Sequence, residues 1–289
     1  MVHFNPMATI TRNKDTSITL SITIPWNAVK AAYEEVVADT VANAEIDGFR
    51  KGKAPRAVVE KTLDPSRVYE EAIKRLIPKE YDAAVKEHDI HPIIMPSIKL
   101  KEAKENEDWV VEATVCEKPN VTLKDYKTPI KNLKADKTKK IWVPGEDPKK
   151  KDEKPQGPSL SELLTVLTQN IDITIPDILV EEEVNRMLSD LIDQTKKIGL
   201  TIDQYLASTK KTAESIKQEY TLQAKTNLSI EFALETIADT ESLHVEDSDI
   251  QAVLDKTQDP KEREALGKQK YYIASVLRRQ KTLDFLSAL

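Results

Sequence analysis

Hydrophobic and polar residues alternate in two stretches of the N-terminal part of the chain. In the first, "MATITR" is followed by the polar turn "NKDTS" and by "ITLSITIP", where Pro25 ends the pattern. In the second, "PSIKLKEA" and the polar turn "KENED" precede "WVVEATVCEKP". A period of two on either side of a polar turn predicts a β-hairpin at each place. The apolar faces of the inner strands are Ile18, Leu20, Ile22 and Ile24, and Trp109, Val111, Ala113 and Val115.

Helical spacing replaces this alternation between the two hairpins. Residues 26–45 carry apolar side chains every three or four positions, which predicts an amphipathic helix. A short helix through Leu63, with Pro55 in its first turn, and a longer helix from Pro65 are predicted next. The order hairpin, helix, loop, helices, hairpin predicts one α+β domain over residues 1–118.

The sequence changes character between residues 119 and 158. Residues 134–155 hold eight lysines, five acidic residues and three prolines, with little apolar content. Such a composition cannot bury a core, so a linker or extended arm is predicted over 119–158. The apolar triplet Ile141, Trp142 and Val143 interrupts it, and we expect this triplet to dock onto a neighbouring surface.

Helical patterns follow, and they predict an all-helical domain over residues 159–289, with strands confined to the N-terminal part of the chain. The longest helix, from Thr212 to Thr240, carries two apolar stripes, which fit either burial between helices or one exposed face; burial is favoured. Two capped helices are predicted after it. The stripes are Ile216, Tyr220, Ala224, Leu228 and Phe232, and Ile230, Leu234 and Ile237; the inward residues of the last helix are Ile273, Val276, Leu277, Leu283 and Leu286.

Composition narrows the class of protein. The chain is 39% hydrophobic and 32% charged, with six glycines, 5% aromatic residues and a net charge of −6. This predicts a soluble, mostly helical α+β protein. We find neither a secretory signal nor a membrane span, so we expect a cytoplasmic protein without a membrane partner.

Candidate metal and thiol chemistry is sparse. Cys116 is the only cysteine, which excludes an intramolecular disulfide and a cysteine zinc cluster, and its neighbours predict a structural thiol on a strand. The four histidines form no HExxH motif, and His88 and His91 lie where a helix is predicted to end. We therefore expect no metal, no cofactor and no catalytic residue.

The loop "DGFRKGKAPR" at residues 47–56 is unusually basic for an acidic chain. It is not a phosphate-binding P-loop, because Gly48 and Gly52 are one residue too close, Ala54 replaces the serine or threonine, and a helix precedes it. Its residues suit docking instead. Phe49 is an apolar anchor and Arg50 can bind a carboxylate or phosphate in a bidentate manner.

The other basic residues of the loop extend this interpretation. Lys51, Lys53 and Arg56 form a cationic rim, suited to RNA phosphates or an acidic protein patch. The loop is therefore predicted to bind a large, negatively charged partner.

"GFRKGKAP" resembles the signature G-F-R-x-G-K-x-P of the trigger factor family, bacterial chaperones of the ribosomal exit tunnel. The order of the N-terminal elements, "PNVTLKDYK", "IPDILVEEEVNRML" and "QDPKE" are also similar to that family.

The resemblance implies an ATP-independent chaperone that docks on the large ribosomal subunit beside the exit tunnel, on protein and ribosomal RNA, and shields nascent or unfolded polypeptides in a helical cradle. Phe49, Arg50 and Lys51 would carry docking, and Gly48, Gly52, Lys53 and Pro55 would complete the motif. Candidates for client contact are Ile141, Trp142, Val143, Phe232 and Tyr272.

One departure concerns the prolyl isomerase domain of the FKBP type that many members carry. Such a domain needs about 100 residues, whereas the lysine-rich segment from Lys134 to Pro158 has only 25. The closer resemblance is to members without that domain, so we expect no enzyme. The alternatives are a prolyl isomerase, and a ribosome-binding assembly factor that holds no clients; a homodimer of the free protein stays open.

Overall fold

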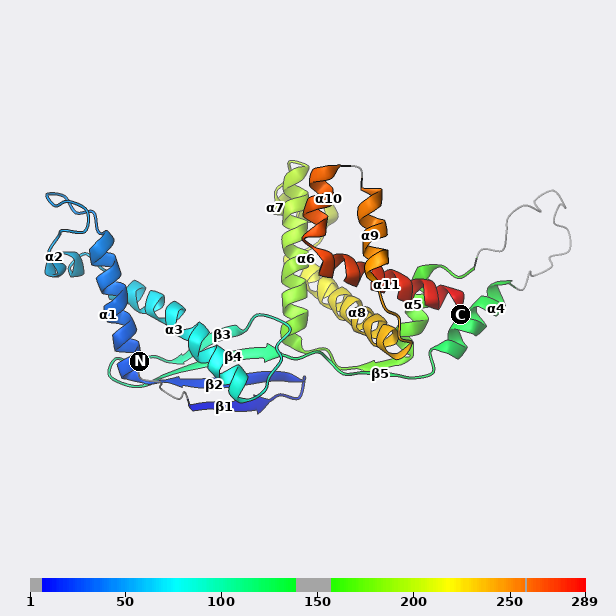
Figure 1. The fold of residues 1–289 in the computed structure, drawn as a ribbon, viewed down its shortest axis with the longest axis horizontal. Coiled ribbons are helices and arrows are strands. Elements are labelled where there is room, and N and C mark those ends of the chain that lie inside the picture. Colours follow the sequence, from blue (N-terminus) through cyan, green and yellow to red (C-terminus); the bar gives the residue numbers. More distant parts are fainter. Residues whose placement is uncertain (1–6, 139–156, 258) are drawn as a thin grey trace. The chain divides into compact units, whose positions relative to one another are not determined.

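The computed structural model describes residues 7–138, 157–257 and 259–289. The chain folds into two compact units (Figure 1). The first unit comprises Met1–Lys118 and Pro176–Leu179, and the second comprises Pro119–Ile175 and Val180–Leu289. The apolar triplet Ile141, Trp142 and Val143 lies outside the described residues.

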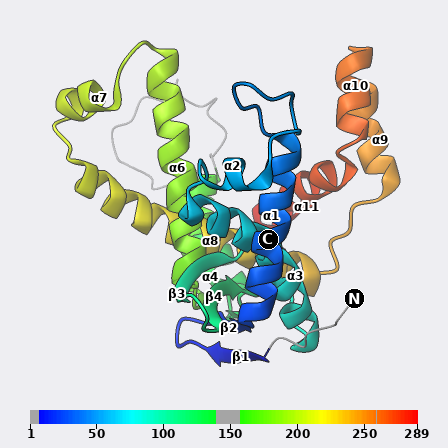
Figure 2. The same cartoon turned by 90° about the vertical axis from the view of Figure 1, so that its left-hand side faces the viewer.

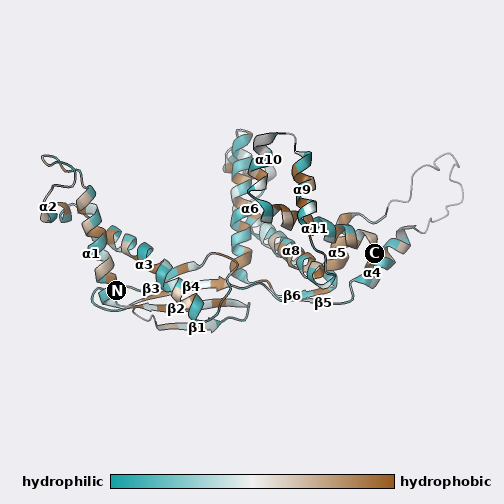
Figure 3. Cartoon of the chain, in the orientation of Figure 1, coloured by the Kyte–Doolittle hydropathy of each residue, from teal (hydrophilic) through white to brown (hydrophobic). Residues whose placement is uncertain are grey.

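An antiparallel sheet of four strands forms the first unit's base, in the order β1-β2-β4-β3. Its register places Ile18 opposite Val115 and Leu20 opposite Ala113, so the apolar faces of the inner strands coincide and are buried. Hydrophobic and hydrophilic residues alternate along these strands (Figure 3), and both predicted hairpins are confirmed. The strands are β1 (Met7–Arg12), β2 (Ser17–Ile24), β3 (Ser97–Glu102) and β4 (Trp109–Cys116).

Three helices complete the first unit: α1 (Trp26–Asn43), α2 (Arg56–Glu60) and α3 (Pro65–Glu87). α3 packs on β2, and α1 packs on α3 through a cluster that includes Val36 and Ala72. Arg75 on α3 pairs with Asp39 on α1 at 2.6 Å. Because α1 continues past the sheet, the loop that follows it lies at the far end of the helix pair (Figure 2). α2 ends at Glu60, short of the predicted Leu63, where the chain turns.

The second unit is mostly helical, as predicted. Its helices include a capped α5, in which Ser159 and Glu162 form the capping box. The elements are β5 (Val121–Leu123), α4 (Lys127–Thr138), α5 (Leu160–Gln169), β6 (Ile171–Ile173), α6 (Asp177–Lys197), α7 (Ile202–Thr209), α8 (Ala213–Thr240), α9 (Asp247–Lys256), α10 (Pro260–Gly267) and α11 (Lys270–Ala288).

The prediction that strands are confined to the N-terminal part of the chain is wrong. β5 and β6 pair antiparallel, with Thr122 opposite Asp172. Strands of three residues are too short to give a readable alternation. The first part of the segment predicted as an arm is also folded, because α4 buries Ile130 and Tyr126 precedes it in the core.

The predicted last helix is two helices. The chain turns after Gly267, so that α10 packs on α9 while α11 packs on α8. Ile273 and Leu286 are buried as predicted, but Val276 is exposed, because it lies beside a hollow rather than under a neighbouring helix. On α8 most of both apolar stripes is buried, which supports burial between helices over an exposed face.

Candidate functional site

The loop between α1 and α2, residues 44–55, folds back on itself through its own backbone. The Gly52 N–H donates to the Ala44 carbonyl oxygen at 3.0 Å, which closes the loop. Inside it, the Phe49 N–H donates to Ile46 at 3.0 Å, and the Lys53 N–H donates to Arg50 at 2.9 Å. The tripeptide from Phe49 to Lys51 is thus held between two tight turns. We call residues 44–55 the docking loop.

Its two glycines are needed for different reasons. Both have left-handed backbone angles, with φ of +88° at Gly48 and +69° at Gly52, a region that other residues occupy at a cost. A Cβ at Gly52 would lie 2.3 Å from the Ala42 carbonyl oxygen, whereas a Cβ at Gly48 would have open space around it. The end of α1 therefore touches the loop at Gly52, and a side chain cannot fit there.

The side chains of the docking loop point outward. Phe49 is 45% exposed, a large value for a phenylalanine, and Arg50, Lys51 and Lys53 are exposed as well. Only Ala54 is buried at the foot of the loop. Lys51 has an ion pair with Glu45 at 3.3 Å, but both side chains are mostly exposed, so water screens this pair strongly.

Arg56 belongs to the base of the loop rather than to the predicted cationic rim. Its guanidinium lies 2.5 Å from a Glu34 oxygen on α1 and 2.6 Å from a Glu60 oxygen on α2. The hydrogen bond to Glu34, followed by the one to Glu60, raises the pKa of Arg56 above its ordinary value. Arg56 thereby ties α2 to α1, and it leaves Arg50, Lys51 and Lys53 as the cations that face outward. Pro55 precedes α2 as its N-cap residue.

A second surface of interest lies within the second unit, where α8 and α11 border a hollow of about 380 Å³. Leu234 and Ala238 form its apolar floor, and Tyr272 and Val276 stand beside it. Four charged residues also line the hollow: Glu231, Glu235, Arg278 and Arg279. Tyr272 is 65% exposed, so this predicted client-contact residue is accessible. We call this surface the α8–α11 hollow.

Phe232, another predicted client-contact residue, is only 8% exposed and is part of the core. Its place on α8 explains the difference, because the stripe that contains it packs against neighbouring helices. The sequence pattern does not predict that Val276 is exposed, because its spacing matches the inward face of the helix. Its side chain is exposed because it lines the hollow between α8 and α11.

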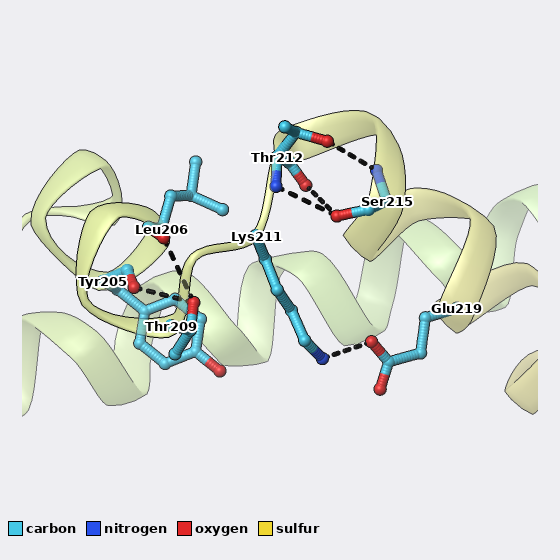
Figure 4. A network of polar contacts seen from close by, with 7 residues as sticks. All are labelled: Tyr205, Leu206, Thr209, Lys211, Thr212, Ser215 and Glu219. Carbon is cyan, nitrogen blue, oxygen red and sulfur yellow. Dashed lines mark hydrogen bonds and ion pairs between the residues drawn. The ribbon is translucent and has the colours of Figure 1, made fainter.

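Other polar clusters serve the fold. At the turn between α7 and α8 (Figure 4), the Thr212 and Ser215 side chains cap α8 reciprocally, at 3.1 and 2.9 Å, and Lys211 pairs with Glu219. Cys116 is buried at the end of β4, and His88 caps α3, as predicted.

Across the described residues there is no group of three or more His, Cys, Asp and Glu side chains that could hold a metal. The described helices include none that is long and apolar enough to cross a membrane.

These features define the class of the protein. It is a protein of two units, in which an α+β unit presents an exposed aromatic and cationic loop and a mostly helical unit has a hollow between α8 and α11.

Comparison with known families makes this assignment specific. The N-terminal model of the family described as "Bacterial trigger factor protein (TF)" matches residues 7–141, and the C-terminal model of the same family matches residues 149–288. Together the two models account for nearly the whole chain. The chain therefore belongs to the trigger factor family.

Individual relatives share a more limited stretch. A trigger factor of Lactococcus lactis subsp. cremoris (strain MG1363) is 35% identical over 130 residues, which is 45% of this chain and 30% of the relative. A trigger factor of Natranaerobius thermophilus is 38% identical over 138 residues, which is 48% of this chain and 29% of the relative. The matched stretch thus spans less than a third of these relatives.

A solved structure described as "Promiscuous Substrate Recognition in Folding and Assembly Activities of the Trigger Factor Chaperone" has a similar fold. The TM-score is 0.61, over 96% of this chain and 98% of that chain, at 14% sequence identity. At this identity the likeness establishes the fold alone, and it agrees with the predicted α+β class with a helical C-terminal region.

Proposed function

We propose that this protein is a ribosome-associated chaperone of the cytoplasm, which docks beside the polypeptide exit tunnel through the docking loop and holds unfolded or nascent polypeptides without ATP. Family membership supports the chaperone class. The observation that carries the docking role is the exposed tripeptide Phe49, Arg50 and Lys51, which the closed backbone of the loop projects away from the helices. We assign docking to residues 1–118 and client holding to residues 159–289.

The chemistry of the loop suits a composite surface of protein and ribosomal RNA. Phe49 offers an apolar anchor for a protein pocket, and Arg50 offers a planar group for a carboxylate or phosphate. Arg50, Lys51 and Lys53 can neutralise three phosphates. If all of them do so, affinity should fall about 20- to 40-fold between roughly 50 and 200 mM salt, because each phosphate contact releases counterions.

The holding role rests on weak apolar contacts. The α8–α11 hollow exposes Tyr272 and Val276 above an apolar floor, a surface that suits hydrophobic segments of many sequences. Tethering at the ribosome would raise the local concentration of client, so weak contacts suffice. This role needs neither a cofactor nor a catalytic residue, and we expect no acceleration of proline-limited refolding.

Co-sedimentation with bacterial ribosomes at moderate salt tests the docking role. The Phe49→Ala, Arg50→Ala, Lys51→Ala triple variant should stay in the supernatant while the unsubstituted protein pellets. A matched control removes the same two positive charges elsewhere, through Lys14→Ala and Lys30→Ala at exposed positions outside the loop. Circular dichroism checks that each variant is folded. If the triple variant pellets like the control, the loop is not the anchor.

Aggregation of a denatured client protein tests the holding role. Replacing Tyr272 and Val276 by serine should weaken the suppression of aggregation, whereas Leu222→Ser, an exposed apolar site on α8 outside the hollow, should weaken it less. An assembly factor that holds no clients would bind ribosomes without suppressing aggregation. That outcome would remove the holding role and leave docking intact.

A further inference from the structure

The sheet of the first unit has an open edge at β3. In the strand order β1-β2-β4-β3, this strand pairs with β4 only among the described residues, and all six of its residues are exposed. An edge strand presents a row of backbone N–H and C=O groups that another extended chain can pair with. The face and charge of β3 indicate what kind of chain this would be.

The edge at β3 exposes apolar side chains that no described helix covers. Ile98 lies opposite Ala113 and Leu100 lies opposite Val111, so both share the face on which the sheet buries its core. They are nevertheless 42% and 47% exposed, because α3 packs on β2, two strands away. Met95, just before the strand, is 86% exposed. Among the described residues of this unit, most of the large apolar side chains that are exposed lie between residues 93 and 100.

The opposite face of β3 carries positive charge. Lys99 lies across from Glu112, but that carboxylate is 3.2 Å from the ammonium group of Lys101. An added strand would therefore meet Lys99 at its centre. An acidic residue at that position would be favoured, and a lysine would be repelled.

The same lysine disfavours a second copy of this chain as the occupant. The symmetric antiparallel register that places Ile98 opposite Leu100 also places the two Lys99 side chains opposite each other. Like charges directly across a pair of strands destabilise it. A lysine on an edge strand is also a common device against self-association.

We infer that β3 is a second client-binding site, which takes an extended segment of an unfolded polypeptide by strand addition. Its preferred segment alternates apolar residues, which contact Ile98 and Leu100, with an acidic residue that faces Lys99. This inference rests on the proposed holding function, and it adds to it a defined binding mode and a sequence preference.

The experiment measures binding of labelled peptides to the full chain by fluorescence anisotropy. The probes are Thr-Val-Glu-Val-Glu-Val-Thr, the same peptide with lysine in place of glutamate, and the glutamate peptide with methyl groups on two successive backbone nitrogens. The protein should bind the glutamate peptide about fivefold more tightly than the lysine peptide. Backbone methylation keeps the side chains but removes donors from both edges, so it should weaken binding at least about tenfold.

Two variants assign the effect to β3. Lys99→Glu should reverse the preference between the acidic and basic peptides. Lys14→Glu, the same charge change at an exposed position in the turn after β1, should leave the preference unchanged. Replacing Ile98 and Leu100 by threonine, which keeps strand propensity, should weaken binding of the glutamate peptide about tenfold.

Several outcomes would overturn the inference. These are no binding of the glutamate peptide, equal binding of the methylated peptide, or the same preference in Lys99→Glu as in Lys14→Glu. Ribosome co-sedimentation and aggregation suppression are run on the same preparations. If both persist while the peptide preference is absent, only the β3 site fails. If the unsubstituted protein neither pellets nor suppresses aggregation, the proposed function fails instead.

Discussion

The two glycines of the docking loop allow a test of whether docking depends on the closed backbone of the loop. We consider Gly48→Ala and Gly52→Ala, which add the same methyl group four residues apart. At Gly48 the added carbon has open space, so the cost is that of a left-handed alanine, about 1 kcal/mol. At Gly52 the carbon would also lie 2.3 Å from the Ala42 carbonyl oxygen, well inside the 3.4 Å at which ordinary contact begins. The loop must open to relieve that overlap.

The hydrogen bonds of the loop set how large a penalty it can absorb before it opens. Gly52, Phe49 and Lys53 donate one backbone bond each, worth about 1 kcal/mol, so the closed loop is favoured over open conformers by about 3 kcal/mol. A penalty of about 1 kcal/mol in Gly48→Ala leaves more than about 90% of the molecules closed, whereas the overlap in Gly52→Ala exceeds what the three bonds can absorb and opens the loop. Apparent affinity follows the competent fraction, so Gly48→Ala should change binding less than about twofold and Gly52→Ala should weaken it at least about tenfold.

Ribosome co-sedimentation titrations measure both affinities. Thermal unfolding followed by circular dichroism should change little in either variant, because the exposed residues of the loop lie outside the buried clusters of the first unit. Equal losses for the two variants would refute the steric argument at Gly52. Unchanged binding of Gly52→Ala would show that docking does not depend on the closed loop.

Three further predictions concern stability and the roles of single charges. Ile130→Ala on α4 should destabilise the second unit by about 2–4 kcal/mol in urea unfolding, because this side chain is fully buried; a residue of a free linker would show no effect. The hydrogen bond from Lys127 lowers the pKa of Glu241 below its ordinary value of 4.5, so this carboxylate stabilises the fold above that pH and loses its contribution as the pH falls through the lower folded pKa. Glu241→Gln should therefore cost about 1 kcal/mol at pH 7, and the difference between it and the unsubstituted protein should shrink in urea unfolding at acid pH. Arg56→Ala should leave the midpoint of urea unfolding nearly unchanged, because water screens its half-exposed ion pairs. This variant should pellet with ribosomes, whereas Arg50→Ala should pellet less.

The sequence by itself determined the elements with a strong local signal. Alternation predicted both hairpins, since one face of the sheet is buried and the period of a strand is two. Helical spacing predicted a helix from Thr212 to Thr240, and α8 spans Ala213–Thr240. The residue types and spacing of the docking loop were also enough to identify a candidate binding site and to exclude a P-loop.

Tertiary structure alone decided which of these residues meet, and which stay exposed. β5 and β6 are too short for a readable pattern, and they form only because distant segments pair. Phe232 and Val276 both have the spacing of an inward face, yet one is buried and the other borders a hollow, since burial depends on what lies opposite. The open edge of β3 is likewise a property of the strand order, because an edge exists only where the fold supplies no further strand.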